Sequence, residues 1–190
     1  MASNKAVLGI YSTRSATENA INALRENNFE STDISLLLPE SLGTKEMVTE
    51  KETKAPEGAT VGAGSGAVIG GALGWLVGIG ALAIPGLGPF IAAGPIMATL
   101  AGVGVGGAVG GFSGALVGLG LPEYEAKRYE GRMQKGGILL SVHCDTSEEV
   151  DVAKDIMKRT GGEDISTIRE SSDGPKTSET EEARRARSGY

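Results

Sequence analysis

Hydrophobic and polar residues are distributed very unevenly along this chain. Residues 58–122 contain no charged side chain and no Asn, Gln or His, whereas charged residues are frequent on both sides of this stretch. Within the stretch, glycine recurs at every fourth position in two runs, namely Gly58, Gly62, Gly66, Gly70, Gly74 and Gly78, and then Gly102, Gly106, Gly110, Gly114 and Gly118. Because a four-residue period keeps each run near one face of a helix, we expect two helices that pack through their glycines.

The lengths of the apolar segments predict a helical hairpin. Residues 59–83 and 95–121 are each longer than the roughly 20 residues with which a helix crosses a hydrocarbon core. Glycine weakens a helix in water by about 1 kcal/mol relative to alanine, so its repetition favours a dry environment, either a bilayer or a protein core. The intervening segment, 84–95, is equally apolar. An assembly in which the hairpins form a dry protein core therefore remains an alternative to membrane insertion.

Strand and helix patterns alternate on both sides of the apolar stretch. Residues 6–11 and 32–38 are typical of strands, and the Ser-x-x-Glu sequence at 15–18 has the form of a helix capping box. The second half repeats this plan, with a strand pattern at 137–144, a capping box at 146–149 and a strand that begins at 163. Two βαβ units predict an α+β fold, in which a ferredoxin-like domain is interrupted by the long glycine-zipper hairpin.

Shifts in composition predict the domain organisation. We expect a first βαβ half at 1–39, a charged linker at 40–57, the glycine-zipper hairpin at 58–121, an interfacial connecting helix at 122–136, a second βαβ half at 137–170 and a disordered tail at 171–190. The tail has almost no aliphatic side chain with which to form a core.

The connecting helix carries residue types that are typical of a membrane interface, where aromatic rings lie at headgroup level and cations face phosphates. They are Tyr124, Lys127, Arg128, Tyr129, Arg132 and Lys135. An ordinary solvent-exposed helix is the alternative. Basic residues flank the uncharged stretch on both sides and are absent from it. The positive-inside tendency therefore predicts an inner-membrane protein with the folded domain and both termini in the cytoplasm, or, in the alternative, a cytoplasmic assembly.

One face of the expected sheet is too apolar to be left exposed. We expect the residues that point away from the two helices to be Val7, Tyr11, Leu37, Leu139 and Ile168. This face should pack on a second copy of the chain or on the connecting helix, which predicts at least a dimer.

Composition and charge exclude several classes of function. The net charge is −6, and no basic stripe with interleaved aromatic residues is present, which argues against nucleic acid as the main partner. The N-terminus leads directly into a strand pattern, so we expect no signal peptide. The single cysteine, Cys144, adjoins the single histidine, His143, on an expected strand, where their side chains point to opposite faces. We therefore expect no catalytic, cofactor-binding or metal-binding residue, no cofactor, no small-molecule substrate and no enzymatic activity.

Several segments resemble the bacterial general stress protein family, which includes heat-induced and low-temperature-induced members. The resemblance rests on residues 7–11, 33–35, the glycine-rich insertion, 122–126 and 136–142. None of these segments is a catalytic signature. The resemblance implies a stress-linked, membrane-associated bacterial protein.

These patterns together predict a non-enzymatic stress-associated protein that is anchored in the membrane by a self-associating glycine-zipper hairpin. Its expected partners are the lipid bilayer and further copies of the chain, in a homo-oligomer. The alternative is a soluble self-assembling filament or particle whose hairpins form the dry core.

Overall fold

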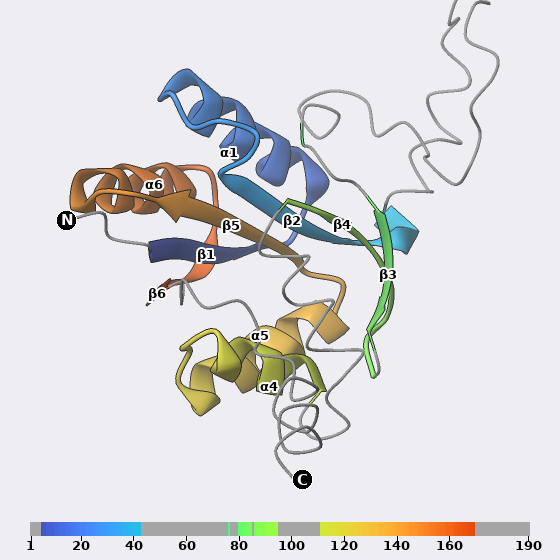
Figure 1. Cartoon of the computed structure of the whole chain (residues 1–190). Coiled ribbons are helices and arrows are strands. Elements are labelled where there is room, and N and C mark those ends of the chain that lie inside the picture. The colour runs from blue at the N-terminus through green and yellow to red at the C-terminus, as the bar shows by residue number, and fades with distance from the viewer. Residues whose placement is uncertain (1–4, 43–75, 77–79, 85, 95–110, 170–190) are drawn as a thin grey trace, which may run out of the picture.

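A computed structural model describes residues 5–42, 76, 80–84, 86–94 and 111–169 of the chain. Its centre is a six-stranded sheet in the order β3-β4-β2-β5-β1-β6, in which each pair of neighbours is antiparallel (Figure 1). The strands are β1 (Lys5–Tyr11), β2 (Ile34–Pro39), β3 (Gly80–Ile84), β4 (Gly88–Ala93), β5 (Ile138–Cys144) and β6 (Glu163–Arg169). The fold is α+β, as the alternation of strand and helix patterns predicts.

Helices cover both faces of the sheet. Helices α1 (Arg14–Glu26) and α6 (Ser147–Arg159) lie on one face, and α4 (Gly111–Gly118) and α5 (Glu123–Gln134) lie on the other (Figure 1). The capping box that was expected at the start of α6 is confirmed, because the Thr146 side chain accepts from the Glu149 N–H and the Glu149 carboxylate accepts from the Thr146 N–H. The one expected at Ser15 is wrong. Helix α1 begins two residues earlier, and its N-cap is Thr13, whose hydroxyl accepts from the Ala16 N–H.

The sheet separates two apolar cores. One core lies under α1 and α6 and includes Val7, Tyr11 and Leu140. The other lies under α4 and α5 and includes Leu8 and Leu139. Neighbouring residues of a strand enter opposite cores because their side chains alternate between the faces.

The two expected halves of the domain each form a strand, a helix and a strand, and they meet at the centre of the sheet. β1 pairs with β5 over its whole length, from Lys5 opposite Cys144 to Tyr11 opposite Ile138. β1 also pairs with β6, and β2 pairs with β5. The four strands of the two halves therefore have the order β2-β5-β1-β6.

Residues 80–93 correct the prediction of a helix through residue 83 and an apolar hairpin tip at 84–95. They form the β3–β4 strand pair, which adds to the sheet beside β2, with Leu37 opposite Ala92. The chain reverses at a turn in which the Leu87 N–H donates to the Ile84 carbonyl at 3.0 Å. Gly86 takes a φ of +82° there, a value that suits glycine. Pairing with β2 provides hydrogen bonds for backbone N–H and C=O groups, which a helix would have bonded to one another. A segment of small apolar residues can therefore form either a strand or a helix.

The remainder of the expected hairpin, at 58–75, 77–79 and 95–110, lies outside the described residues. Within the expected second span, residues 111–118 are helical as α4. Among the helices in the described part of the chain, none is long and apolar enough to cross a membrane.

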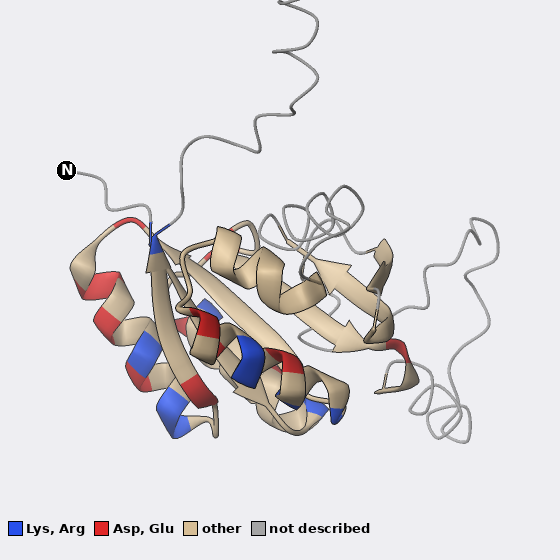
Figure 2. Cartoon of the chain, turned by 90° about the horizontal axis from the view of Figure 1, so that it is seen from below, with Lys and Arg blue, Asp and Glu red and all other residues tan. Residues whose placement is uncertain are grey.

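Charge is segregated across the domain (Figure 2). Among the helices and strands, Lys, Arg, Asp and Glu occur in α1, α5, α6 and β6 and at Lys5 of β1, whereas β2, β3, β4, α4 and β5 contain none of them. The domain therefore has a charged part and an uncharged part.

Candidate functional site

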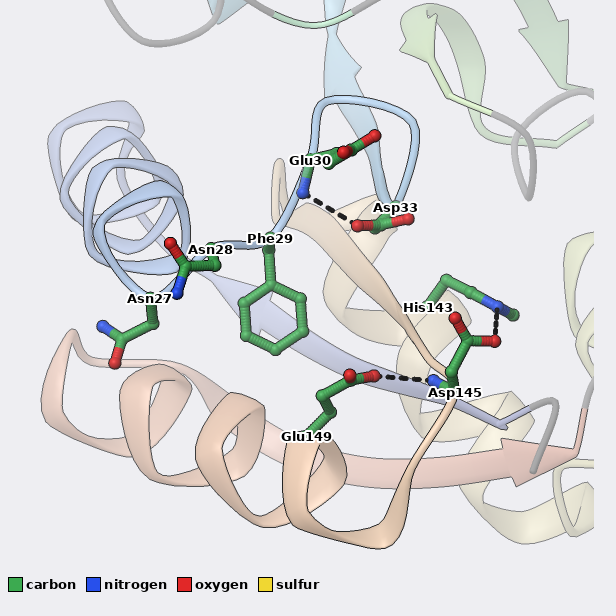
Figure 3. A pocket seen from close by; sticks show the side chains of 8 residues that line it. All are labelled: Asn27, Asn28, Phe29, Glu30, Asp33, His143, Asp145 and Glu149. Atoms are coloured by element: carbon green, nitrogen blue, oxygen red, sulfur yellow. Dashed lines mark hydrogen bonds and ion pairs between the residues drawn. The ribbon is translucent and has the colours of Figure 1, made fainter. Parts of the chain in front are cut away.

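A pocket of about 480 Å³ opens at one end of the sheet (Figure 3). It lies between the loop that joins α1 to β2 and the loop that joins β5 to α6. These loops meet because β2 and β5 are antiparallel, which brings the start of one strand beside the end of the other. The lining residues are Asn27, Asn28, Phe29, Glu30, Asp33, His143, Asp145 and Glu149.

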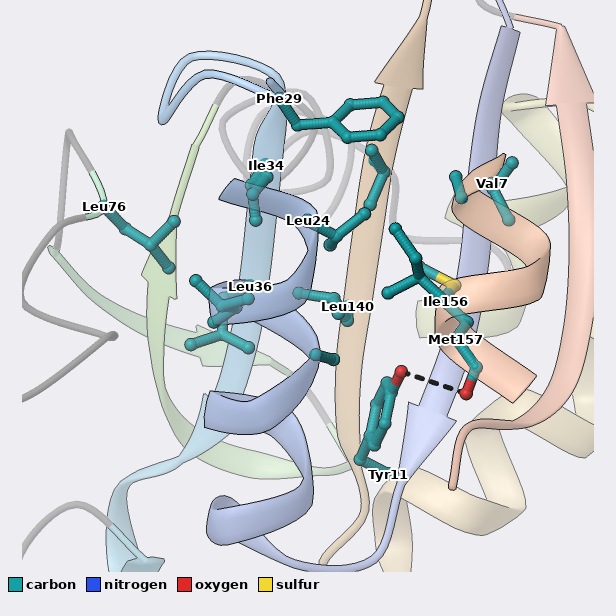
Figure 4. Packing of buried hydrophobic residues seen from close by; sticks show 14 of the residues in the cluster. Val7, Tyr11, Leu24, Phe29, Ile34, Leu36, Leu76, Leu140, Ile156 and Met157 are labelled. Carbon is teal, nitrogen blue, oxygen red and sulfur yellow. Dashed lines mark hydrogen bonds between the residues drawn. The ribbon is translucent and has the colours of Figure 1, made fainter. Parts of the chain in front are cut away.

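The first wall of the pocket is built by the chain as it leaves α1. Asn28 adopts a φ of +67°, a left-handed conformation that asparagine tolerates and that ends helices. The Phe29 N–H then donates to the Leu24 carbonyl at 3.2 Å. The Phe29 ring turns into the core beside Leu24, and only 6% of the residue is exposed (Figure 4). This ring fixes the position of the wall.

The carboxylates of the pocket hold the backbone of their own loops. An Asp33 carboxylate oxygen accepts from the Glu30 N–H at 2.8 Å. A Glu149 oxygen accepts from the Asp145 N–H at 2.7 Å, in addition to its capping-box bond. The two walls are joined by the His143 N–H, which donates to the Asp33 carbonyl at 2.8 Å.

Four carboxylates and one imidazole make this an acidic recess. The His143 Nε2 atom lies 3.3 Å from an Asp145 carboxylate oxygen. In the part of the chain that the structure describes, no group of three or more His, Cys, Asp or Glu side chains is arranged to hold a metal ion. The recess can attract a cation, but its carboxylates serve the loop structure.

A second polar cluster joins α5 to the edge strand β6. The Asp164 carboxylate pairs with Arg128 at 3.1 Å and with Arg132 at 3.2 Å, and Arg132 also reaches Glu163 at 2.8 Å. Asp164 presents its side chain from an irregular part of β6, where its φ is +51° and the register with β1 shifts between Leu8 and Ile10. This bulge directs the carboxylate toward α5.

Two further side chains complete the contact between α5 and β6. The Tyr129 hydroxyl has one proton, which it can donate to the Asp164 carbonyl or to the Leu8 carbonyl, and burial raises the pKa of Tyr129 to about 12. The Ser166 hydroxyl donates to a Glu125 carboxylate oxygen at 2.6 Å, and this bond, with a second from Tyr124, lowers the pKa of Glu125. Helix α5 is therefore held to the sheet by charged and neutral hydrogen bonds as well as by its apolar side.

The residues predicted to form a membrane interface divide between surface and core. Tyr124, Lys127 and Lys135 are exposed. Arg128 and Arg132 form ion pairs with the acidic residues of β6, and Tyr129 is fully buried. The aromatic and basic composition of α5 did not reveal that one of its tyrosines belongs to the core.

The residues predicted to form an oligomer face lie in both cores. Leu37, Leu139 and Ile168 face α4 and α5, on the expected side. Val7 and Tyr11 instead face α1 and α6. The residues of β1 that face one core and those that face the other are all apolar, because helices cover both faces of the sheet. The sequence pattern alone therefore did not indicate which residues face which helices.

Most of the predicted helix-packing glycines lie outside the described residues, and their packing stays a prediction. The two that are described, Gly114 and Gly118, belong to α4. Gly114 is half-buried and Gly118 is exposed, with no atom within 4 Å of the place where a Cβ would stand. Gly118 therefore makes no close helix contact within the described part of the chain.

Sequence reasoning missed the acidic recess and the bulge at Asp164. A signal for the recess existed, because Asp33 precedes one expected strand and Asp145 follows another, and adjacent antiparallel strands bring such positions together. No sequence signal indicates the left-handed conformation of Asp164.

Comparison with known proteins identifies a family. The family model described as "ActD: Alternative complex III, ActD subunit" matches residues 5–167. No curated protein and no solved structure gives a significant match.

The match corrects the resemblance to general stress proteins and the stress-associated function drawn from it. Two of the segments that carried the resemblance overlap the central strands, since 7–11 lies in β1 and 138–142 of the segment 136–142 lies in β5. Their apolar residues are those that any strand covered on both faces requires, so they are weak evidence of family.

The expected partners and the expected anchor are corrected as well. A subunit of a multi-subunit complex has other subunits as its partners, so the expectation that the partners are mainly lipid and further copies of this chain is wrong. The predictions of a self-associating hairpin and of a soluble homo-assembly depended on that expectation and are wrong as well. Coarse membrane association is consistent with the family match.

Proposed function

The chain belongs to the ActD family of alternative complex III subunits, and we propose that it is a non-catalytic subunit that contributes to the assembly of this respiratory electron-transfer complex. The observation that carries the proposal is the extent of the family match. It covers residues 5–167 and so includes the uncharged stretch and both strand–helix–strand halves except the last two residues of β6.

The use of the polar side chains supports a structural role. In the acidic recess, Asp33 and Glu149 accept hydrogen bonds from backbone N–H groups of their own loops. At α5, Arg128 and Arg132 pair with Asp164 of β6. These groups rigidify the domain, and a rigid domain with defined surfaces suits docking to other subunits.

We interpret the domain as ferredoxin-like with an insertion. In this proposal the two halves of the domain are residues 1–39 and 137–170, and the segments between and after them are 40–57, 58–121, 122–136 and 171–190. The strand order β2-β5-β1-β6, with α1 and α6 on one face, supports the interpretation. In this view the insertion supplies β3, β4 and α4.

We further propose that the folded domain lies on the cytoplasmic side of the membrane. Lysine and arginine flank the uncharged stretch on both sides and are absent from it, which favours the cytoplasm by the positive-inside tendency. A cysteine at Ser178 would test this with a membrane-impermeant maleimide. Inverted membrane vesicles should be labelled and right-side-out vesicles should not, and the reverse result would contradict the placement. Cys144 is buried and gives little background.

Purification of the tagged full chain tests the assembly role. Membranes of the native host are solubilised in mild detergent, and the proteins that elute with the tag are identified and quantified by mass spectrometry. Other subunits of alternative complex III should elute in amounts comparable to the chain, and deletion of the gene should lower the yield of intact complex. A chain that elutes alone, with the complex intact in the deletion strain, would overturn the proposal. The untagged strain is the control.

A further inference from the structure

The two edges of the sheet are protected to very different degrees. An edge strand presents a row of unpaired N–H and C=O groups, and proteins shield such edges with charges, bulges or covering segments. At one edge, β6 carries Glu163, Asp164 and Arg169, contains the bulge at Asp164 and is tied to α5 by ion pairs. Charges and a bulge, two of these protective devices, are therefore present at this edge.

The other edge strand, β3, contains neither a charged residue nor a bulge. Its sequence is Gly-Ala-Leu-Ala-Ile, without a charge, and its register with β4 is regular from Gly80 opposite Ala92 to Ile84 opposite Gly88. Gly80, Ala81 and Ala83 are exposed. Among the described residues, β3 pairs only with β4 and ends the sheet.

The side chains of β3 make the backbone easy to approach. Ile84 is buried and Leu82 is partly buried against the core under α4, which fixes the strand on the domain. Ala81 and Ala83 point to the opposite face, and their methyl groups are too small to shield a backbone. The strand is therefore packed on the domain by one face, while Gly80, Ala81 and Ala83 are exposed.

From this contrast we propose that β3 is a docking edge, at which an extended and uncharged segment of another subunit of the complex adds a seventh strand to the sheet. The inference rests on the proposed function, because it takes the partner from the same complex. Main-chain hydrogen bonds would supply the attraction, as in other cases of strand addition.

Hydrogen-bond complementarity and charge together define the occupant. Only another extended backbone offers alternating donors and acceptors at the spacing of a strand. β3, β4 and α4 carry no charged residue that could neutralise a charge on the incoming segment (Figure 2). A charge buried there would be unpaired, which is costly, so the segment should be uncharged where it contacts β3.

Charged substitutions in the full chain test the edge. Ala81→Lys places a cation at the contact, and we expect the amounts of co-purified complex subunits to fall by about tenfold or more. Ala81→Ser is the neutral control at the same position, and Thr167→Lys is the charge control on the exposed part of β6. Both controls should retain the subunits. Thermal unfolding of each variant checks that the domain remains folded.

Photocrosslinking tests the occupant without relying on disruption. A photoreactive phenylalanine analogue is introduced at Ala83, or at Thr167 as the control, and the purified complex is irradiated. We expect a crosslink from position 83 to an extended segment of a different subunit of the complex, identified by mass spectrometry. A crosslink only to a second copy of the chain, or none at all, would overturn the proposal.

The two proposals fail in different ways. If no complex subunit co-purifies with the wild-type chain, the assembly role itself is wrong. If the subunits co-purify equally with the wild type and with Ala81→Lys, the assembly role stands and docking at β3 is wrong.

Discussion

Gly94 is the residue at which the β3–β4 pair is most sensitive to a single added atom. It has a φ of +87°, and a Cβ there would collide with the Ile34 carbonyl oxygen and lie 2.6 Å from the Ser35 hydroxyl oxygen. Backbone strain of about 1–2 kcal/mol and overpacking of about 1–3 kcal/mol should therefore both lower the free energy of unfolding of Gly94→Ala.

Gly86→Ala is the matched control, because Gly86 has a similar φ of +82° but no atom within 4 Å of its Cβ position. It should lose only the strain contribution, about 1–2 kcal/mol. Thermal unfolding followed by circular dichroism measures both variants. Equal losses would contradict the close packing of Gly94 on β2.

Tyr129 should make the stability of the domain depend on pH in the alkaline range. Its pKa is raised from 10.0 to about 12 by burial, so the folded state binds the phenolic proton more tightly than the unfolded state. The corresponding stability is fully present below pH 10 and is lost as the pH rises toward 12, by up to about 3 kcal/mol.

Removal of the Tyr129 hydroxyl gives the test of this dependence. Tyr129→Phe removes the one proton that the hydroxyl donates to a carbonyl, so stability at pH 8 should fall by about 1–3 kcal/mol. The decline between pH 10 and 12 should be shallower than in the wild type. Unfolding in urea at a series of pH values measures both effects. Tyr124→Phe, at an exposed position, should change the profile little, and an unaltered profile for Tyr129→Phe would refute the assignment.

At the scale of elements, the attachment of α5 should depend on Asp164 more than on its neighbour Glu163. The Asp164 side chain is 12% exposed and pairs with two arginines, whereas that of Glu163 is 45% exposed. Asp164→Asn removes the charge while keeping a residue that tolerates a φ of +51°. We expect a loss of about 1–2 kcal/mol and faster hydrogen exchange in α5.

Glu163→Gln is the control for this comparison, and its exposed pair should contribute less than about 1 kcal/mol. Hydrogen exchange followed by mass spectrometry reports on α5 separately from the sheet. If α5 exchanges at the same rate in both variants, the bulge does not hold the helix.

The elements that could be predicted from the sequence are those whose pattern has one physical meaning. Regular apolar spacing and the capping box of Thr146 indicate α6, and the connecting helix at 122–136 corresponds to α5. β3 and β4 could not be predicted, because small apolar residues with glycine fit a strand as well as a packed helix. Their state is decided by the free edge of β2, a long-range contact that no local pattern encodes.

The candidate sites were less accessible to sequence reasoning than the fold. The acidic recess requires two loops that are more than a hundred residues apart, and only the strand order places Asp33 beside His143. Tyr129 stands among basic residues in the sequence, as a tyrosine at a membrane interface would. It is nevertheless buried, because it lies on the side of α5 that faces β1 and β6. Which side of a helix faces the core is set by packing.

At the scale of the whole molecule, the segregation of charge predicts how association should respond to salt. If docking uses the uncharged edge at β3, it relies on main-chain hydrogen bonds and apolar contact, which ions screen little. If it used the charged faces of α1, α5 and α6, raising the salt from about 0.1 to 1 M would shorten the screening length from about 10 to 3 Å and weaken it strongly. We therefore expect the co-purified subunits to remain bound to the tagged chain in 1 M NaCl. Quantification of these subunits across a salt series measures how strongly they remain bound. Their release at high salt would assign docking to the charged faces and the acidic recess, because screening removes the attraction only of an interface that is made by charges.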